Sequence, residues 1–372
     1  MSTTKGLEGV VATTSSVSSI IDGVLTYRGY NIDDLADNAS FEEVVYLLWN
    51  HRLPNNEELE SFRKELAEAS EVPQAVLEQM KTYPIKDVHP MAALRTSVSN
   101  LGLFDDAADE TSEEANKLKA LKLQAQLPTL VTAFSRIREG KEPVPPRSDL
   151  SFAANFLYML NGEVPAEISE RAFNKALVLH ADHELNASTF TARVCVATLS
   201  DIYSGVTAAI GALKGPLHGG ANERVMKMLS EIGEVENVES YIKDALDRKV
   251  KIMGFGHRVY KDGDPRAKHL KEMSRQLTSI TNETKWYEMS VKIDEIVTNE
   301  KGLLPNVDFY SASVYHSLGL DHDLFTPIFA VSRISGWIAH ILEQFENNRL
   351  IRPRADYIGP DRQEWVPMEE RK

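Results

Sequence analysis

The chain has 372 residues, of which 42% are hydrophobic and 26% are charged, a composition typical of a folded globular protein that is long enough for two domains. Its formal net charge of -14 at pH 7 argues against non-specific binding to nucleic acid or to an anionic membrane. The single cysteine, Cys195, excludes internal disulfides, and neither a signal peptide nor an uncharged run of membrane-spanning length is apparent. We therefore expect a cytoplasmic enzyme or binding protein.

The region up to residue 31 is the only part with an extended pattern, and we expect a small hairpin around Asp22 and Gly23. Beyond it, nearly every segment has the period of an amphipathic helix. Ser40 and Glu43 fit a capping box. We expect helices from this box up to Pro54 and at about 56–69, 74–83, 90–101, 113–139, 149–160, 166–182, 186–213, 222–232, 238–248, 264–279, 283–299, 306–318 and 324–346. The predicted fold class is therefore mainly α, with helices packed in more than one layer.

The loop at 215–223 has the sequence Gly-Pro-Leu-His-Gly-Gly-Ala-Asn-Glu. Its Gly-Pro and Gly-Gly pairs interrupt regular structure, and a helical pattern begins at Asn222. The free backbone N–H groups of that helix then point back at the loop, so His218 lies where an imidazole can reach a ligand. An ordinary interhelical turn with an exposed histidine is the alternative that this stretch leaves open.

Two more histidines, His180 and His183, lie three residues apart at the end of a predicted helix, and Glu184 follows them. This spacing puts both imidazoles on one face, so a divalent metal ion is conceivable. The segment does not have the H-E-x-x-H pattern of zinc hydrolases. We favour a polar pocket or a capping role and expect no metal site.

A glycine-rich segment at 254–266 contains His257, Lys261 and Arg266. It begins Gly-x-Gly, but its sixth position is Val259 and no strand is expected before it, so it fails the requirements of a dinucleotide-binding loop. From Lys251 to Gln276 there are seven Lys or Arg residues against three Asp or Glu residues, in a chain of strongly negative charge. A solvated helix face explains part of this excess, but the loop position of the cations favours an anion site.

Asp308 falls in the first turn of a predicted helix among apolar and aromatic neighbours. The helix dipole alone explains a carboxylate at this position. A carboxylate withdrawn from water would instead have a raised pKa and could act as a general base. Later in the chain Arg333 lies in an apolar helix, where a cation usually has an anionic partner, and Arg352 belongs to a cluster of arginines near the C-terminus.

These segments, in this order, resemble the citrate synthase family, and in particular its short bacterial form. The motifs that carry the resemblance are G-P-L-H-G-G-A-N-E at 215–223 and G-F-G-H-R-V-Y-K-x-x-D-P-R-A at 254–267. The resemblance runs the length of the chain and implies an almost wholly helical, two-domain homodimer. It implies a discontinuous large domain at 1–217 and 320–372, with a small domain at 218–319 inserted between the two parts.

The resemblance also implies catalytic roles for three residues. Asp308 would remove a methyl proton from acetyl-CoA, while His218 would donate a hydrogen bond to the thioester oxygen. His257 would polarise the ketone of oxaloacetate and protonate the alkoxide that forms. No cofactor or metal is implied, and acetyl-CoA serves as a co-substrate.

Binding residues follow from the same motifs. His183, Arg266 and Arg333 would hold oxaloacetate, and Arg352 would join them from the other subunit. Lys261 is a candidate for contact with a phosphate of CoA.

Three other interpretations stay open at this point. The sister family of 2-methylcitrate synthases shares the motifs and uses propionyl-CoA, and a pocket discriminates one methylene by only about 1–3 kcal/mol. A metal-dependent hydrolase built on His180, His183 and His218 would contain stoichiometric zinc. A helical interaction scaffold would catalyse no release of CoA.

Overall fold

The computed structural model describes residues 5–7, 9–257 and 259–371. The predicted fold class is confirmed, because these residues form 16 α-helices and a single three-stranded sheet. The predicted hairpin is also present, with Ser18 opposite Tyr27 in antiparallel register. Asp22 and Gly23 form its turn with φ values of 51° and 78°, the positive values that a two-residue type I′ turn requires. The strands are β1 (Ser18–Ile21), β2 (Val24–Tyr27) and β3 (Tyr30–Asn31).

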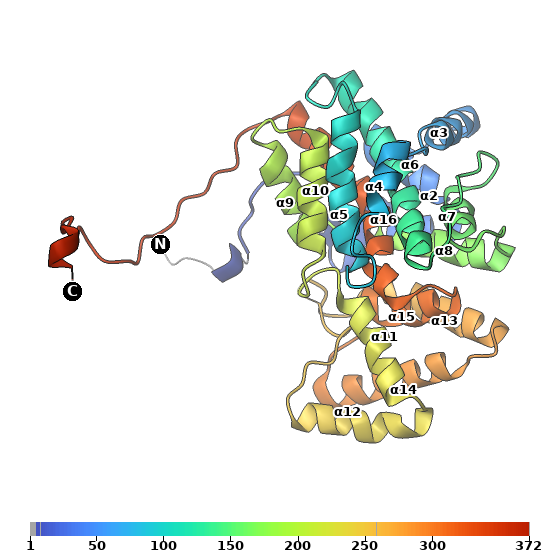
Figure 1. Ribbon diagram of the computed structural model, residues 1–372. Coiled ribbons are helices and arrows are strands. Elements are labelled where there is room, and N and C mark those ends of the chain that lie inside the picture. The colour runs from blue at the N-terminus through green and yellow to red at the C-terminus, as the bar shows by residue number, and fades with distance from the viewer. Residues whose placement is uncertain (1–4, 8, 258, 372) are drawn as a thin grey trace.

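The larger group of helices packs around α16 (Phe325–Glu346), which lies at its centre (Figure 1). The segment His322–Glu346 is long and apolar enough to cross a membrane by composition, but its most apolar 18 residues all lie inside the protein, as expected of a core helix. The other members are α1 (Ile32–Asn38), α2 (Phe41–Asn50), α3 (Asn56–Glu68), α4 (Gln74–Met80), α5 (Pro90–Leu101), α6 (Glu113–Arg138), α7 (Phe152–Asn161), α8 (Glu167–His180), α9 (Ala187–Val196) and α10 (Ile202–Leu213).

A second group of helices lies below the first in Figure 1, with α15 in contact with α11, α13 and α14. Its members are α11 (Ala221–Ile232), α12 (Val238–Asp247), α13 (Ala267–Ile280), α14 (Lys285–Lys301) and α15 (Val307–Ser317). All five helices fall within the predicted small domain, whose boundaries stay a prediction. Short 3₁₀-helices are η1 (Lys5–Leu7), η2 (Gly102–Phe104), η3 (Val235–Asn237), η4 (His322–Leu324) and η5 (Met368–Glu370).

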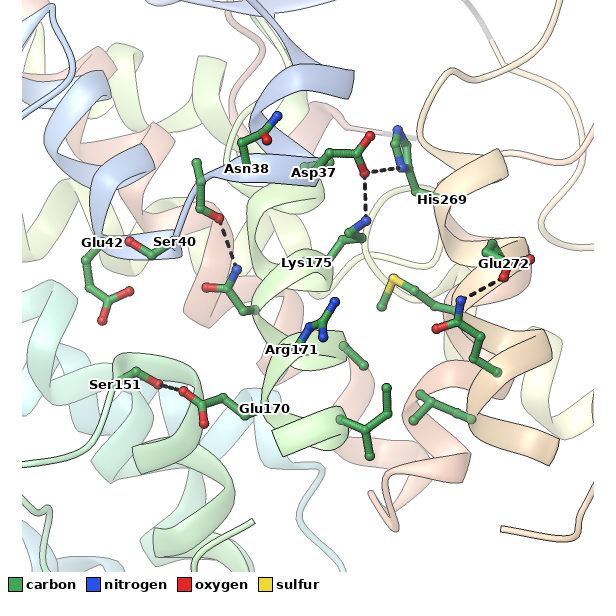
Figure 2. Close-up of a pocket in the computed structure, with 18 of the residues that line it drawn as sticks. Asp37, Asn38, Ser40, Glu42, Ser151, Glu170, Arg171, Lys175, His269 and Glu272 are labelled. Atoms are coloured by element: carbon green, nitrogen blue, oxygen red, sulfur yellow. Dashed lines mark hydrogen bonds and ion pairs between the residues drawn. The ribbon is translucent and has the colours of Figure 1, made fainter. Parts of the chain in front are cut away.

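Charged side chains tie α13 of the second group to α1 of the first. Lys268 and His269 lie 2.6 and 2.7 Å from the carboxylate of Asp33. Beside them is a groove of about 590 Å³, where Asp37 pairs with Lys175 at 2.8 Å and approaches His269 at 3.6 Å (Figure 2). These contacts hold the start of α13, and with it the preceding loop, against the larger group.

The prediction of one helix over 186–213 is wrong. The segment forms α9 and α10, and Leu199 between them has a φ of 67° that no right-handed helix allows. Asp201 caps the second helix by accepting from Ser204 N, and this capping signal outweighs the continuous helical period. Helix α1 was not predicted either; its cap is Asn31, whose side chain accepts from Asp33 N.

Beyond Asn347 the chain leaves the helical body as an extended segment, and the N-terminal segment leaves on the same side in Figure 1. Tyr357, Ile358 and Trp365 on the C-terminal segment are largely exposed. Exposed apolar side chains that gather on one segment can mark a surface that contacts another protein.

Candidate active site

His218 lies in the turn between α10 and α11. The backbone folds back on itself there, because Gly219 N donates to Leu213 O at 2.9 Å and His218 N donates to Gly215 O at 2.9 Å. A Cβ at Gly219 would come within 2.5 Å of Leu213 O, so the turn requires glycine at this position. The loop thereby holds the imidazole at the start of α11.

Ser188, in the first turn of α9, orients the ring of His218. Its backbone N–H donates to Nε2 at 3.3 Å, and its hydroxyl, which accepts from Trp337 Nε1 at 2.9 Å, lies 2.8 Å from the same nitrogen. Because Nε2 accepts the backbone bond, the neutral ring carries its proton on Nδ1. Burial, with a smaller contribution from Arg333, lowers the pKa of His218 to about 4, so the ring is neutral at pH 7.

The glycine-rich loop before His257 pairs with the segment that precedes Asp308. Asn306 N donates to Gly254 O at 2.9 Å, and the Asn306 side chain donates to the carbonyl of residue 256 at 2.9 Å. Gly254 has a φ of 82°, and a Cβ there would lie 2.9 Å from the Cα of Phe309. Glycine at this position therefore allows the two segments to approach each other. The approach brings together the segments of His257 and Asp308, which are 51 positions apart in the chain.

The ring of His257 is oriented by its own loop. Its Nδ1 accepts from Val259 N at 3.0 Å, so the neutral ring carries its proton on Nε2. Burial, and to a smaller extent the charge of Arg266, lowers the pKa of His257 to about 4. The ring centroid lies 5.1 Å from that of His183. Arg258, the next residue of the motif, lies outside the described residues.

Asp308 is the second residue of α15, and its backbone N–H donates to the side chain of the N-cap Asn306 at 3.0 Å. The residue is half-buried, and the protein around its carboxyl removes much of the water that would hydrate a charge. Burial raises the pKa of Asp308 to about 7, although Arg266 and Arg333 lower it and Asp264 raises it further. Desolvation thus outweighs the stabilisation of a carboxylate by the helix N-terminus.

Arg266, directly before α13, is paired with a carboxylate of its own loop. Asp264 accepts from its Nε at 2.9 Å and from its Nη2 at 2.8 Å, and the same carboxylate accepts from Val307 N at 3.0 Å. Asp264 therefore joins the guanidinium to the first turn of α15. Burial raises and Arg266 lowers the pKa of Asp264, with a net lowering, so this buried pair is ionised.

Arg333 approaches the site from α16. Its Nε donates to His180 O at 2.8 Å, and its guanidinium lies 4.7 Å from the ring centroid of Phe329. Within the described residues neither Nη1 nor Nη2 of Arg333 has a hydrogen-bond partner, so both can bind a ligand carboxylate. Burial lowers its pKa to about 10, which leaves the group charged at pH 7. The neighbouring His183 is buried, with Nε2 3.0 Å from the hydroxyl of Tyr260.

The ring of Phe329 connects these groups, because its centroid is 6.3 Å from that of His218 as well as close to Arg333. One chain thus brings together most of the predicted residues, namely His183, His218, His257, Arg266, Asp308 and Arg333. Lys261 is exposed on the same loop as His257. Arg352 is exposed and belongs to the C-terminal segment that follows α16, which runs out from the helical body (Figure 1).

Sequence reasoning missed three residues of the site. Ser188 lies two residues after Asn186, the N-cap of α9, so the capping residue indicated a helix start next to it. Asp264 lies two residues before Arg266, and this acid–base spacing was visible in the motif. Tyr260 gave no signal of its own.

His180 is not placed as a metal ligand. Its Nδ1 lies 2.7 Å from Ala176 O of its own helix, and its ring packs edge-on against Phe329 at 5.1 Å. Across the described ranges, no three His, Cys, Asp or Glu side chains form a group that could hold a metal ion. Burial lowers the pKa of His180 to about 3, so the ring is a neutral packing element.

The arrangement has a definite chemical capacity. A carboxyl with a raised pKa can accept a proton from carbon, and neutral imidazoles that present N–H groups can donate to developing oxyanions. Buried guanidinium groups can bind a dicarboxylate. The site is therefore equipped to deprotonate next to one carbonyl and to activate a second.

Comparison with known proteins agrees with this chemistry. The family described as citrate synthase, C-terminal domain, matches residues 6–354. The chain is 72% identical to citrate synthase 2 of Bacillus subtilis (strain 168), with 100% of both chains covered. It is 43% identical to 2-methylcitrate synthase 1 of Corynebacterium glutamicum, over 99% of this chain and 98% of that one.

Among solved structures, the citrate synthase of Thermoplasma acidophilum in a ternary complex with carboxymethyl coenzyme A and oxaloacetate superposes with a TM-score of 0.93. It is 34% identical to this chain, and the match covers 98% of each. Both the sequence and the fold therefore match along the whole chain. The chain belongs to the citrate synthase family.

Proposed function

We propose that the chain condenses acetyl-CoA with oxaloacetate and hydrolyses the resulting citryl-CoA to citrate and CoA, the first step of the tricarboxylic acid cycle. The observation that carries this proposal is the raised pKa of Asp308 at the segment that pairs with the His257 loop. A carboxyl with a pKa near 7 is a stronger base than an ordinary aspartate and is still ionised in a large fraction of molecules at neutral pH.

In the first step Asp308 takes a proton from the methyl carbon of acetyl-CoA. A thioester α-carbon is a weak acid, so the negative charge that moves onto the carbonyl oxygen needs a partner. His218 supplies it, because Ser188 holds Nε2 and leaves the Nδ1 proton for the thioester oxygen. A neutral imidazole suits this role, because its N–H group can donate to the thioester oxygen as negative charge develops there.

In the second step the enol carbon attacks the ketone carbon of oxaloacetate. His257 donates from Nε2 to the ketone oxygen and protonates the alkoxide as the carbon–carbon bond forms. Arg266, Arg333 and His183 bind the oxaloacetate carboxylates. Water then attacks the thioester carbonyl, the carbon–sulfur bond breaks, and CoA leaves as the thiol.

The proposal extends to a homodimer in which Arg352 of each chain completes the site of the other. The extended C-terminal segment supports it, because this segment leaves its own body and carries exposed apolar side chains that a second chain can cover. We propose further that Lys261 contacts a phosphate of CoA, that no cofactor is needed, and that the enzyme works in the cytoplasm.

The test is the release of CoA thiol from acetyl-CoA in the presence and absence of oxaloacetate. Release that depends on oxaloacetate supports the proposal, and no release with any acyl-CoA contradicts it. The 2-methylcitrate synthase alternative is tested in the same assay with propionyl-CoA. We expect kcat/KM to be higher with acetyl-CoA, since the 72% identical relative is named a citrate synthase and the 2-methylcitrate synthases are more distant.

A further inference from the structure

The turn that carries His183 is held in an unusual conformation. It joins α8 to α9, and Glu184 directly after the histidine has a φ of 51°, the left-handed region that side chains other than glycine avoid. Such a residue persists only where surrounding contacts hold it in place, and such residues cluster at functional sites. The contacts that hold this turn are therefore informative.

Ser18 on β1 forms hydrogen bonds to the turn on both sides of His183. Its hydroxyl donates to Asp182 Oδ2 at 2.5 Å and accepts from Glu184 N at 2.9 Å. Ser18 is buried, and it is 164 positions from Asp182 in the chain. One side chain thus joins the residue before His183 to the residue after it.

Asp182 also receives a hydrogen bond from His340 on α16, with Nε2 at 3.3 Å from Oδ2. Both side chains are 0% exposed. Arg193 Nη1 lies 3.2 Å from the other ring nitrogen of His340, and the guanidinium pairs with Glu343 at 2.6 Å. Arginine can only donate, so Nδ1 of His340 accepts and its Nε2–H donates to Asp182.

The hydrogen bonds therefore run in one direction, from Arg193 through His340 to the carboxylate of Asp182. Burial raises the pKa of Asp182, but His340, Arg333 and Ser18 lower it by more, so the carboxylate is ionised and accepts from both neighbours. A buried charge of this kind adds little net stability compared with apolar residues of the same size. A positional role explains its presence better than a stabilising one.

Helix α16 also touches the turn directly. Gly336 N donates to Ala181 O at 3.2 Å, and a Cβ on Gly336 would lie 2.5 Å from the same oxygen. Since Arg333 projects from the preceding turn of α16, the helix that carries a predicted oxaloacetate ligand is also the helix that positions the turn of His183.

We propose that Asp182, His340 and Ser18 are positioning residues that hold His183 in place for the oxaloacetate carboxylates. All three are buried, and in this proposal they act on the substrate only through the turn at 182–184. The inference rests on the proposed function, because His183 is assigned to oxaloacetate there.

The experiment compares four variants of the full-length enzyme. Ser18→Ala removes both of these hydrogen bonds without leaving a buried charge unpaired. Its matched control is Ser19→Ala, whose hydroxyl has Thr26 of the same hairpin as its only hydrogen-bond partner in the described part of the chain. His340→Leu breaks the directed chain, while His340→Gln keeps an acceptor for Arg193 and a donor for Asp182. Each variant is assayed for KM of oxaloacetate and of acetyl-CoA, for kcat, for oxaloacetate binding by calorimetry, and for thermal unfolding.

We expect Ser18→Ala and His340→Leu to raise KM for oxaloacetate about 10-fold, within the loss of about 10²-fold that a displacement of 1 Å can cause. KM for acetyl-CoA should change less than about 2-fold, His340→Gln should recover most of the loss, and Ser19→Ala should match the parent. If the three residues only stabilise the fold, the substitutions will lower the unfolding temperature. The KM for oxaloacetate, measured below that temperature, will then equal that of the parent.

The inference is overturned if folded Ser18→Ala binds oxaloacetate with the affinity of the parent. Ser18→Ala decides the question alone if His340→Leu does not fold, since it leaves the pair of Asp182 and His340 in place. If the parent enzyme releases no CoA thiol, the proposed function fails instead, and calorimetry with oxaloacetate then decides the positioning role by itself.

Discussion

Replacing Asp308 by asparagine tests the proposed base and its environment together. The amide fills nearly the same volume and can still occupy the first turn of α15, but it cannot accept a proton from carbon. We expect kcat to fall by about 10²- to 10⁴-fold, the usual contribution of a positioned general base. The KM for oxaloacetate should change little, because the proposal assigns the binding of that substrate to Arg266 and Arg333 and not to Asp308.

The sign of the stability difference between Asp308→Asn and the parent follows from the pKa shift of Asp308. Burial raises the pKa of Asp308 from 3.8 to about 7, so the folded protein favours the neutral carboxyl. The stability that this neutral form contributes is complete below pH 3.8 and is lost progressively as the pH rises to about 7. The full difference in pKa would correspond to about 4 kcal/mol, and because the side chain is only half-buried we expect about 1–2 kcal/mol.

Asparagine cannot ionise, so Asp308→Asn should be more stable than the parent by this amount at pH 8 and equal to it below pH 4. The assay is urea unfolding of both proteins across this range, with kcat measured from the release of CoA thiol. Glu288→Gln is the matched control, because that carboxylate lies exposed in the first turn of α14. A kcat within tenfold of the parent, or a stability difference that does not vary with pH, would refute the reasoning.

Three further predictions concern the geometry around the base. Ser188→Ala frees Nε2 of His218 from the serine hydroxyl, and we expect kcat to fall about 10-fold with little change in KM for oxaloacetate, measured by steady-state kinetics. Gly254→Ala adds a Cβ 2.9 Å from the backbone of α15 at a φ of 82°, and it should destabilise the protein by about 1–3 kcal/mol in urea and raise KM for oxaloacetate. Arg352→Ala should raise KM for oxaloacetate, and mixing it with a His257→Ala chain should restore activity at one site of each mixed dimer; mixtures without any gain in activity would contradict a shared site.

Much of this protein could be predicted from local patterns. Helical periods, the capping box of Ser40 and Glu43 and the Asp22–Gly23 turn depend on residues a few positions apart, and the structure confirms them. The continuous period over 186–213 misled because a single left-handed residue, Leu199, ends a helix without any glycine or proline to mark it. His218 and His257 stand out along the chain because they lie in distinctive glycine-rich loops, whereas Asp308 is a catalytic candidate only through the family resemblance that those loops carry.

Only the tertiary structure decided the chemical state of those candidates. The pKa of Asp308 depends on burial by segments far away in the sequence, and the proton of His218 is located by Ser188 from another helix. The chain of hydrogen bonds from His340 to Asp182 crosses 158 positions of sequence. Turns and caps are set by neighbours along the backbone, whereas desolvation and hydrogen-bond direction depend on which distant atoms exclude water, and only the folded chain brings those atoms together.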